Sequence, residues 1–340
     1  MAQRVAHPSK LVPSSCDSCS AIYRTSLGQL YQGDCLPLLK SLPDKCIDML
    51  FADPPFNLGK DYGKGISDDL KAEEYLTWSK AWLGEAVRVL SEGGTLFVFN
   101  LPRWLIEYGA FLNGLGMVFR HWIAMRMPKA YPRGQKLSPA HYGCLYYTKG
   151  APKTFHRIYV PIPVCRHCGG EVRDYGGHRK ALNERGLNFM DVVDSPEDVW
   201  SEADRPLARG EGWTDADDLW QDVPPVRHSK YKVRGANELA PIMLERLIAL
   251  STEKGDVVLD PFGGSGTTYY AAEKLGRRWL GIELGDVSGA VRRMEDLRAG
   301  LHQEWESARG NGNSVNQDKQ QLQLIPSRSP DAQNRRRGRL

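Results

Sequence analysis

Two short elements of this 340-residue sequence combine residue types that could perform chemistry on a nucleotide-like ligand. The first is Asp53-Pro54-Pro55-Phe56, which directly follows the apolar run at residues 47–52. Its prolines fix the backbone and remove two N–H donors, so the turn offers a carboxylate and carbonyl oxygens. This turn suits a planar ring that bears an NH₂ group. Asp53 and the Pro54 carbonyl would accept hydrogen bonds from the NH₂ group, and Phe56 would stack on the ring. An Asp that caps a helix before a proline-rich turn is the alternative.

The second element is the glycine-rich turn after the apolar run at residues 257–259. Glycines permit a tight turn in which backbone approaches a ligand, and a helix is expected to begin near Thr267. About twenty residues further on, the next strand ends in Glu283, which is placed to bind ribose hydroxyls. The pattern predicts a nucleoside site at the carboxyl edge of an α/β sheet, against the alternative of a turn without a ligand. The expected cofactor-binding residues of this half are Asp260, Phe262, Gly263, Gly264, Ser265, Gly266, Thr267 and Glu283.

Three other glycine motifs do not fit this turn. A dinucleotide fingerprint needs glycine where Tyr269 stands, and a nucleophile elbow around Ser265 needs glycine where Thr267 stands. The Gly-Lys-Ser/Thr of a P-loop is absent from the turn. A dinucleotide oxidoreductase is therefore disfavoured.

The elements that must position these residues fall into two α/β blocks around an irregular middle. Strands are expected at GQLYQGD, IDMLFAD and TLFVFN in the first block, with a helix whose apolar face includes Tyr75, Trp78 and Trp82. In the second block, a helix over 237–251 precedes the strands DVVLD and RRWLGIE. This alternation predicts a parallel sheet covered by helices.

Composition gives the broad class of the protein. The chain is 41% apolar and 25% charged, and 45 basic against 41 acidic residues give a net charge of +4, which excludes a histone-like polycation. No run of eighteen apolar residues predicts a membrane span, and the N-terminus lacks the apolar segment of a secretory signal. Seven cysteines without such a signal favour a reducing cytoplasm.

Together the two elements resemble the amino-group DNA methyltransferases that use S-adenosylmethionine. DPPF resembles their catalytic motif and DPFGGSGTT their cofactor motif, and the order catalytic half, variable middle, cofactor half is similar to their beta class. The segment GDCLPLLKSLPDKCIDMLFADPPF matches the family's Gly-Asp segment, whose aspartate, here Asp34, faces the cofactor adenine. NELAPIMLERLIALS resembles the helix near the methionine moiety. Family members often have Tyr at Phe56 and Lys-Pro at Ala240-Pro241, which leaves open the group that neutralises the cofactor carboxylate.

The resemblance implies a fold and a division of the chain. The fold is α/β: a Rossmann-like class I methyltransferase sheet, circularly permuted, with an irregular inserted target-recognition region. The expected parts are an N-terminal arm at 1–27, the catalytic half at 28–127, the recognition region at 128–228, the cofactor half at 229–300, and a disordered basic tail at 301–340.

The resemblance also implies a mechanism. A duplex base hides its amino group, so the target base is expected to flip out into the pocket between the halves. Family enzymes for adenine typically have Asp at the first catalytic position and those for cytosine N4 typically Ser, so Asp53 favours N6 of adenine. Cytosine-C5 chemistry is disfavoured because no Pro-Cys pair occurs. The alternatives are a cytosine-N4 or RNA methyltransferase and a non-catalytic DNA-binding scaffold.

Double-stranded DNA is the implied partner, and the charge distribution indicates where it binds. Residues 108–170 contain nine Lys or Arg and no acid, interleaved with aromatic residues that include Tyr142, whereas residues 187–222 contain eleven acids and two Arg. Basic side chains neutralise phosphates and aromatic rings stack on bases, although many of these rings belong to the core. The expected DNA-binding residues are Arg126, Lys129, Arg133, Lys136, Arg227, His228 and Lys230. A restriction–modification or phage context, a cognate restriction endonuclease and a homodimer accompany this interpretation.

Two CxxC pairs could bind a metal ion. Cys16 and Cys19 form one pair, and Cys165 and Cys168 form the other. Each pair is half of a tetrahedral site, so together they predict a structural Zn²⁺ that ties the N-terminal arm to the recognition region. His167 and His178 are alternative ligands, and free thiols are the alternative to metal. The other three cysteines are expected in the core.

Overall fold

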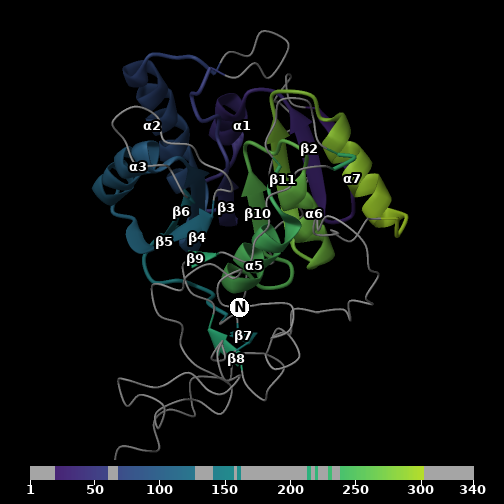
Figure 1. Ribbon diagram of the computed structural model, residues 1–340. Coiled ribbons are helices and arrows are strands. Elements are labelled where there is room, and N and C mark those ends of the chain that lie inside the picture. Colours follow the sequence, from purple (N-terminus) through teal and green to yellow (C-terminus); the bar gives the residue numbers. More distant parts are fainter. Residues whose placement is uncertain are drawn as a thin grey trace, which may run out of the picture.

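The computed structural model describes residues 20–59, 68–126, 141–156, 159–161, 213–215, 219–220, 229–231 and 238–301. A nine-stranded sheet forms the centre, in the order β1-β2-β11-β10-β3-β4-β6-β5-β9, and β7 pairs with β8 apart from it (Figure 1). The strands are β1 (Ala21–Arg24), β2 (Gly28–Gln32), β3 (Ile47–Ala52), β4 (Leu90–Asn100), β5 (Val118–Arg126), β6 (His141–Thr148), β7 (Tyr159–Pro161), β8 (Trp213–Asp215), β9 (Leu219–Trp220), β10 (Val257–Asp260) and β11 (Arg278–Glu283).

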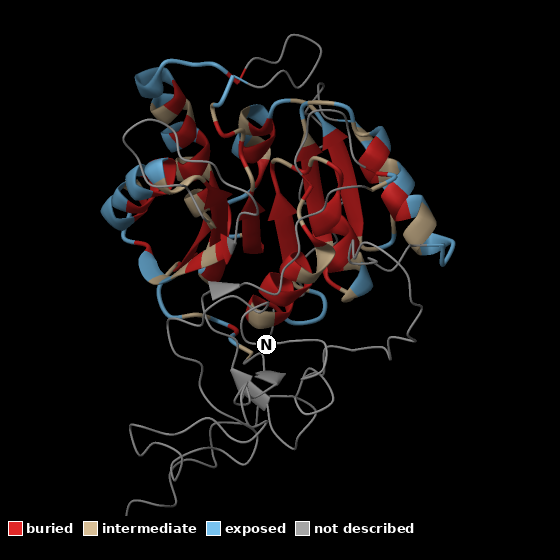
Figure 2. Cartoon of the chain, viewed as in Figure 1, coloured by how far each residue is buried: buried red, intermediate tan, exposed pale blue. Residues whose placement is uncertain are grey.

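Helices cover both faces of the sheet. On one face α1, α2 and α3 pack against a core that includes Leu50, Trp82 and Leu105. On the other face α5, α6 and α7 pack against a second core that includes Phe51 and Trp279. Figure 2 shows the central strands buried and the outer helices exposed on one side. The helices are α1 (Cys35–Ser41), α2 (Ala72–Val89), α3 (Pro102–Gly114), α5 (Pro241–Ser251), α6 (Thr267–Lys274) and α7 (Ser288–Arg298).

The order of the strands in space differs from their order in the chain. β10 pairs in parallel with β3, so that Leu259 lies opposite Leu50, and β11 joins β10 to β2. The two strands of the second sequence block, β10 and β11, thus lie between β2 and β3 of the first block within one sheet. Because β2, β11, β10, β3 and β4 are parallel, their carboxyl ends meet at one edge. Asp34, Glu283, Asp260 and Asp53 follow or end these strands, and the fold therefore brings the sequence motifs together at that edge.

The secondary structure expected for the two α/β blocks is confirmed. The three strands of the first block, the helix that contains Tyr75 and the helix–strand–helix–strand order of the second block are all present. The expected recognition region at 128–228, in contrast, also contributes to the core. β6 pairs antiparallel with both β4 and β5, and Leu145 lies opposite Val98. Residues 141–148 therefore form a strand of the central sheet, where they supply the hydrogen-bonding partner that the edge of β4 requires.

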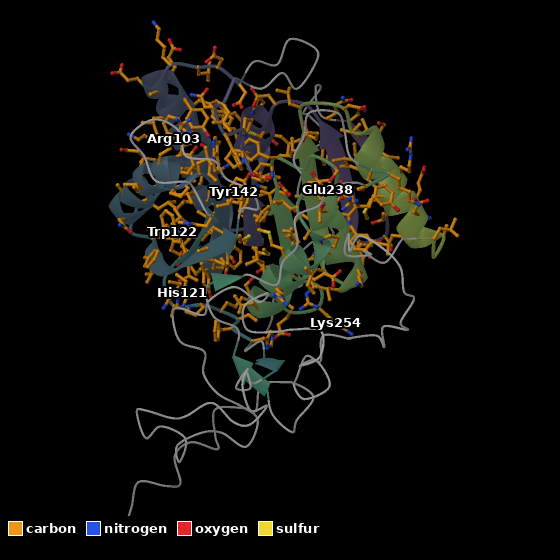
Figure 3. The ribbon with its side chains drawn as sticks, viewed as in Figure 1. Arg103, His121, Trp122, Tyr142, Glu238 and Lys254 are labelled. Atoms are coloured by element: carbon orange, nitrogen blue, oxygen red, sulfur yellow. The ribbon has the colours of Figure 1, made fainter. Side chains whose placement is uncertain are left out.

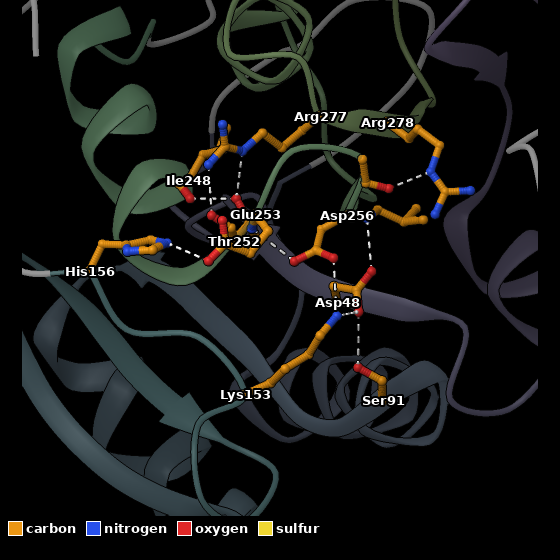
Figure 4. A network of polar contacts seen from close by, with 12 residues as sticks. Asp48, Ser91, Lys153, His156, Ile248, Thr252, Glu253, Asp256, Arg277 and Arg278 are labelled. Carbon is orange, nitrogen blue, oxygen red and sulfur yellow. Dashed lines mark hydrogen bonds and ion pairs between the residues drawn. The ribbon is translucent and has the colours of Figure 1, made fainter. Parts of the chain in front are cut away.

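The amino edge of the sheet, opposite the motifs, is joined by a polar network (Figure 4). The Asp48 carboxylate accepts hydrogen bonds from the Val257 N–H and the Lys153 ammonium, each at 2.9 Å. Lys153 also pairs with Asp256 at 3.0 Å. Asp48 is the second residue of β3, Lys153 follows β6 and Asp256 precedes β10, so the network joins three segments that are distant in the chain.

Two further expectations concern membranes and cysteines. Among the helices of the described residues, none has the length and apolar content that crossing a membrane requires. Cys35 and Cys144 are buried and Cys46 is partly buried, in keeping with the core positions expected for them.

Candidate functional site

The two sequence elements predicted to act in catalysis and in cofactor binding meet in one pocket at the carboxyl edge of the sheet. Asp53, which follows β3, and the glycine turn, which follows β10, line the same pocket, and Leu239 from the segment ahead of α5 also lines it. The two elements lie about 200 residues apart in sequence, but β3 and β10 are neighbours in the sheet. The lining residues are Phe51, Asp53, Leu239, Asp260, Phe262, Gly263, Gly264, Ser265, Thr267 and Thr268.

The glycine turn owes its shape to close packing as well as to backbone freedom. Gly264 and Gly266 have φ values of 50° and 78°, a region that residues with a Cβ rarely adopt. A Cβ on Gly263 would lie 1.4 Å from the Tyr269 hydroxyl, so this glycine leaves room for the ring beneath it. Tyr269 in turn stacks on Trp279, with ring centroids 5.1 Å apart. The turn thus packs on two stacked aromatic rings and at the same time lines the pocket.

Asp260 is a buried carboxyl group at the end of β10. It accepts hydrogen bonds from the Phe262 N–H at 2.9 Å and from the Thr268 hydroxyl. Burial raises the pKa of Asp260 to about 7, although these two hydrogen bonds oppose the shift. A positively charged ligand in the pocket would favour its ionised form.

Glu283 connects the end of β11 to the glycine turn. One carboxylate oxygen accepts from the Gly264 N–H at 2.7 Å and the other from the Gly285 N–H at 2.6 Å. A carboxylate has about four acceptor sites, so each oxygen still has a lone pair for a ligand hydroxyl. The acid predicted to bind ribose therefore lies directly against the turn.

Asp34 lies on the wall of a hollow beside Glu283. The hollow measures about 220 Å³ and lies between the ends of β2 and β11, with Tyr31, Gly33 and Ile282 among its lining residues. Asp34 also begins α1, where its carboxylate accepts a hydrogen bond from the Leu36 N–H at 2.9 Å. The aspartate is exposed and follows β2 at the same edge of the sheet as the pocket.

Side chains from α2 and α3 fix the carbonyl groups of the turn that follows Asp53. The Tyr75 hydroxyl donates to the Pro55 carbonyl at 2.5 Å, and the Trp104 indole N–H donates to the Phe56 carbonyl at 2.9 Å. Arg103 donates to the Asn57 carbonyl at 3.1 Å. Within the described residues no hydrogen bond is made to the Pro54 carbonyl.

An aromatic cluster lies beside Asp53. The Phe56 ring is buried and tilted against Phe99 and Tyr142, with centroids 6.0 and 5.8 Å away. Burial and the Asp53 carboxylate both raise the pKa of Tyr142, so this carboxylate lies close enough to influence the phenol. Tyr142 is not among the expected site residues. Its only signal in the sequence is its place in the basic, aromatic stretch, which many core rings share.

Figure 3 shows Tyr142 in one half of the molecule and Glu238 in the other, at similar heights, with Lys254 near the amino edge of the sheet.

Phe262 is expected to contact the cofactor, and it lines the pocket. Its ring also packs against Trp78 and Trp82 of α2, with ring centroids 5.8 and 5.1 Å apart. The glycine turn and α2 are therefore in direct contact beside the pocket.

Most of the expected DNA and metal residues lie outside the described residues. These are Lys129, Arg133, Lys136, Arg227, His228 and the four cysteines Cys16, Cys19, Cys165 and Cys168. Arg126 ends β5, and Lys230 is exposed and pairs with Asp296 at 2.8 Å. Within the part of the chain that the structure describes, no three His, Cys, Asp or Glu residues gather as a metal site.

The donor and acceptor groups fit a nucleoside with a charged tail. Glu283 offers acceptors for hydroxyl groups, and the hollow beside Asp34 offers room for a ring. The pocket contains two carboxyl groups, Asp53 and Asp260, which would attract a positively charged group of a ligand. Chemically, such a site can orient a cationic donor against an amino group held by acceptors.

Comparison with known proteins agrees with this geometry. The profile of the DNA methylase family (N6/N4 type) matches residues 47–287. The chain is 42% identical to the type II methyltransferase M.BamHI of Bacillus amyloliquefaciens over 275 residues, which are 81% of this chain and 58% of that protein. It is 30% identical to M.HpaI of Haemophilus parainfluenzae over 259 residues, 75% of this chain and 70% of that one. The chain thus spans less than two thirds of M.BamHI.

A solved structure shows the same fold. The PvuII DNA methyltransferase, described as cytosine-N4-specific, superposes with a TM-score of 0.51 at 19% identity, over 83% of this chain and 94% of that one. The expected class I methyltransferase sheet is therefore confirmed.

Proposed function

Because this chain belongs to the amino-group DNA methyltransferases, we propose that it transfers a methyl group from S-adenosylmethionine to the exocyclic N6 of an adenine in double-stranded DNA. The observation on which the proposal rests is the shared pocket of Asp53 and the glycine turn. One side of that pocket offers acceptors for an amino group, and the other offers a seat for the methyl donor.

The residues present fit S-adenosylmethionine. Glu283 would accept the ribose hydroxyls, Asp34 would face the adenine, and the glycine turn would approach the methionine end. The bound cofactor supplies a methyl group on a positively charged sulfur. The neighbouring carboxyl of Asp260 would add negative potential near that charge.

The residues of the Asp53 turn would hold the base. A base flipped out of the duplex at a cost of a few kcal/mol would enter the pocket. The Asp53 carboxylate and the Pro54 carbonyl would accept hydrogen bonds from its amino nitrogen and so direct the lone pair toward the methyl group. Alignment and electrostatics would supply most of the rate, without a covalent intermediate.

The resemblance of the Asp53 turn to the adenine enzymes favours adenine as the target. The acceptor pair serves an amino group on either base, so N4 of cytosine is the alternative product. We also propose contacts of the basic residues Arg126, Lys129, Arg133, Lys136, Arg227, His228 and Lys230 with phosphates, and a Zn²⁺ held by Cys16, Cys19, Cys165 and Cys168. A restriction–modification context, with a cognate nuclease, belongs to the same proposal.

The test combines product analysis with ligand binding. Duplex DNA of mixed sequence is incubated with protein and S-adenosylmethionine, digested to nucleosides and analysed by mass spectrometry. We expect N6-methyladenine; N4-methylcytosine would overturn the choice of base, and no methylated amino group would overturn the activity.

Variants at Asp53 test the assigned role. Asp53→Ala should abolish the product while calorimetry still detects S-adenosylhomocysteine binding near the wild-type affinity. Asp69→Ala, an exposed aspartate in the loop that follows, is the matched control and should retain activity. Full turnover by Asp53→Ala would refute the role of the carboxylate.

A further inference from the structure

Arg293 and Glu238 form a buried ion pair behind the cofactor pocket. Arg293 lies on α7 and is 3% exposed, and Glu238 precedes α5 and is 8% exposed. The guanidinium contacts one carboxylate oxygen of Glu238. Arg293 lies beyond residues 47–287, the span matched by the family profile. Its ion-pair partner Glu238 lies within that span.

The ion pair is not fully satisfied. The second carboxylate oxygen of Glu238 and Nε of Arg293 are buried without a hydrogen-bond partner among the described residues. Buried polar groups without partners are destabilising, and an apolar pair of similar volume often stabilises a core better than a buried ion pair. Stability alone therefore gives a poor account of this pair.

Arg293 also reaches the pocket through Thr267. Its second terminal nitrogen donates to the Thr267 hydroxyl oxygen at 2.7 Å. Thr267 lines the pocket beside Ser265, and the two hydroxyl oxygens lie 3.5 Å apart. Because Arg293 can only donate, Thr267 must turn its own hydrogen elsewhere. The arginine thus leaves the Thr267 hydroxyl as a hydrogen-bond donor.

The same corner of the pocket has other donors. α6 begins at Thr267, its N-cap is Gly266, and no side chain caps its first backbone N–H groups. Uncapped N–H groups at a helix N-terminus favour a negatively charged ligand. The Asp260 carboxylate lies at the same helix end, where it accepts a hydrogen bond from the Thr268 hydroxyl, and Asp53 lines the pocket from the turn after β3. The pocket therefore contains hydrogen-bond donors at Thr267 and the α6 N-terminus as well as carboxyl acceptors, and a zwitterionic ligand needs both kinds of group.

The segment on the other side of Arg293 is held in place as well. The guanidinium lies 4.7 Å from the centre of the Tyr231 ring, and the Tyr231 hydroxyl donates to Asp296 of α7 at 2.8 Å. Ring and ion pair fix the guanidinium from two sides. Arg293 is consequently placed with little freedom relative to Thr267.

We propose that Arg293, held by Glu238, is a positioning residue that orients the Thr267 hydroxyl to donate to the carboxylate of the cofactor's amino-acid end. The inference rests on the proposed function, because it needs S-adenosylmethionine or its product in this pocket. Arg293 acts through Thr267 and makes no contact with the reacting atoms.

Two ligands separate this role from a general effect on the fold. S-adenosylhomocysteine contains the amino-acid end, whereas 5′-methylthioadenosine has the same adenosine and thioether without it. Calorimetry on the full chain measures the affinity of each. Arg293→Met should weaken S-adenosylhomocysteine about tenfold to a hundredfold, the worth of a hydrogen bond to a charged group. The same variant should change the affinity for methylthioadenosine less than about threefold.

Further variants make the test specific. Thr267→Val should have the same selective effect, Thr267→Ser should retain the preference, and Arg293→Met combined with Thr267→Val should be no worse than Thr267→Val alone. Arg292→Met, one position earlier and exposed on the same helix, is the matched control. If Arg293→Met does not fold, Glu238→Leu/Arg293→Met replaces the ion pair by apolar side chains and should restore folding without the preference.

Three results would count against the role of Arg293. Equal losses of both ligands would show that Arg293 only supports the turn. Unchanged affinity for S-adenosylhomocysteine would remove the role altogether, as would additive effects of the two substitutions. Failure of the wild-type chain to bind either ligand would instead contradict the proposed function.

Discussion

The Tyr75 hydroxyl donates to the Pro55 carbonyl at 2.5 Å, from a helix that begins well after the turn it holds. The same hydroxyl accepts hydrogen bonds from Tyr108 at 2.9 Å and from Asn100 at 3.2 Å. Its bonding capacity is therefore used completely, and the direction of its hydrogen is fixed. A chain of buried hydrogen bonds of this kind polarises and rigidifies its members. The turn that bears Asp53 is consequently restrained by α2 as well as by its own prolines.

Removal of this donor should loosen the turn without emptying the pocket. For Tyr75→Phe we expect kcat to fall about tenfold, because a shift of the turn misaligns the acceptors. The KM for S-adenosylmethionine should stay near the wild-type value, since the glycine turn is untouched. Steady-state kinetics with saturating DNA measures both constants.

Tyr147→Phe is the matched control for this prediction. Tyr147 is also buried, and its hydroxyl binds Asn113 and Gly109 away from the pocket. It should lose stability comparably without the drop in kcat. Equal effects of the two variants on kcat would show that the hydroxyl of Tyr75 has no special relation to the turn.

Tyr142 offers a second test at the same turn. Its ring lies 5.8 Å from Phe56 and 5.3 Å from Phe99, beside Asp53. If the base stacks in this cluster, Tyr142→Ala should weaken transfer about tenfold or more, as expected for loss of one base–aromatic contact. Tyr142→Phe should retain most of the rate. A fluorescent base analogue at the target position would report whether the alanine variant still holds a flipped base.

A distant aromatic residue controls for simple loss of a ring. Phe119 is 49% exposed and lies at the start of β5, whereas Tyr142 pairs with Met125 near the other end of that strand. Phe119→Ala should therefore leave methyl transfer unchanged. Wild-type rates for Tyr142→Ala would show that the cluster only packs the core.

The sequence predicted the motifs and their strands well because each depends on local signals. A buried strand followed by Asp-Pro-Pro or by a glycine turn can be recognised from adjacent residues alone. α7 could not be recognised in this way: its buried face carries Arg293 beside Ala290 and Met294, so the apolar periodicity is broken. β6 was also missed, since its place between β4 and β5 depends on pairing with strands that precede it in sequence.

The residues of the candidate site also fall into those that local sequence signals predict and those that they do not. Asp53, Asp260 and Glu283 were predicted because their residue types and spacing suggest their chemistry. Tyr75 was predicted only as part of an apolar helix face, and nothing in that pattern indicates its hydroxyl bond to Pro55. Positioning groups come from elements whose spatial neighbours the sequence does not name, and this limits what spacing alone can assign.

The raised pKa of Asp260 predicts pH-dependent cofactor binding. Burial raises this pKa to about 7, so the carboxyl is partly protonated near neutral pH before a ligand binds. The positively charged sulfur of S-adenosylmethionine favours the ionised carboxylate of Asp260, so binding of this cofactor should release a proton. The affinity for S-adenosylmethionine should therefore fall as the pH falls through 7. Calorimetry at pH 6.5 in buffers with different ionisation enthalpies measures the protons released. Asp260→Asn should show no release from this site, and release undiminished in that variant would assign the proton to another group.

Asp48 should support the sheet and not the pocket. Its carboxylate accepts from the buried Val257 N–H and from Lys153 at the amino edge, and Asp48→Ala would leave that N–H unpaired. We expect the free energy of unfolding to fall by about 1–3 kcal/mol, the usual cost of a buried unsatisfied group. Denaturant titration measures this loss, and the affinity for S-adenosylhomocysteine should be unchanged at a temperature where the variant is folded.

Glu92→Ala is the control for this prediction. It breaks only the ion pair with Lys45, in which the Lys45 side chain is 58% exposed and the Glu92 side chain 67% exposed. An exposed ion pair contributes little, so the unfolding midpoint should not change. An Asp48→Ala protein as stable as wild type would mean that the three segments joined at this edge are held together by strand pairing alone.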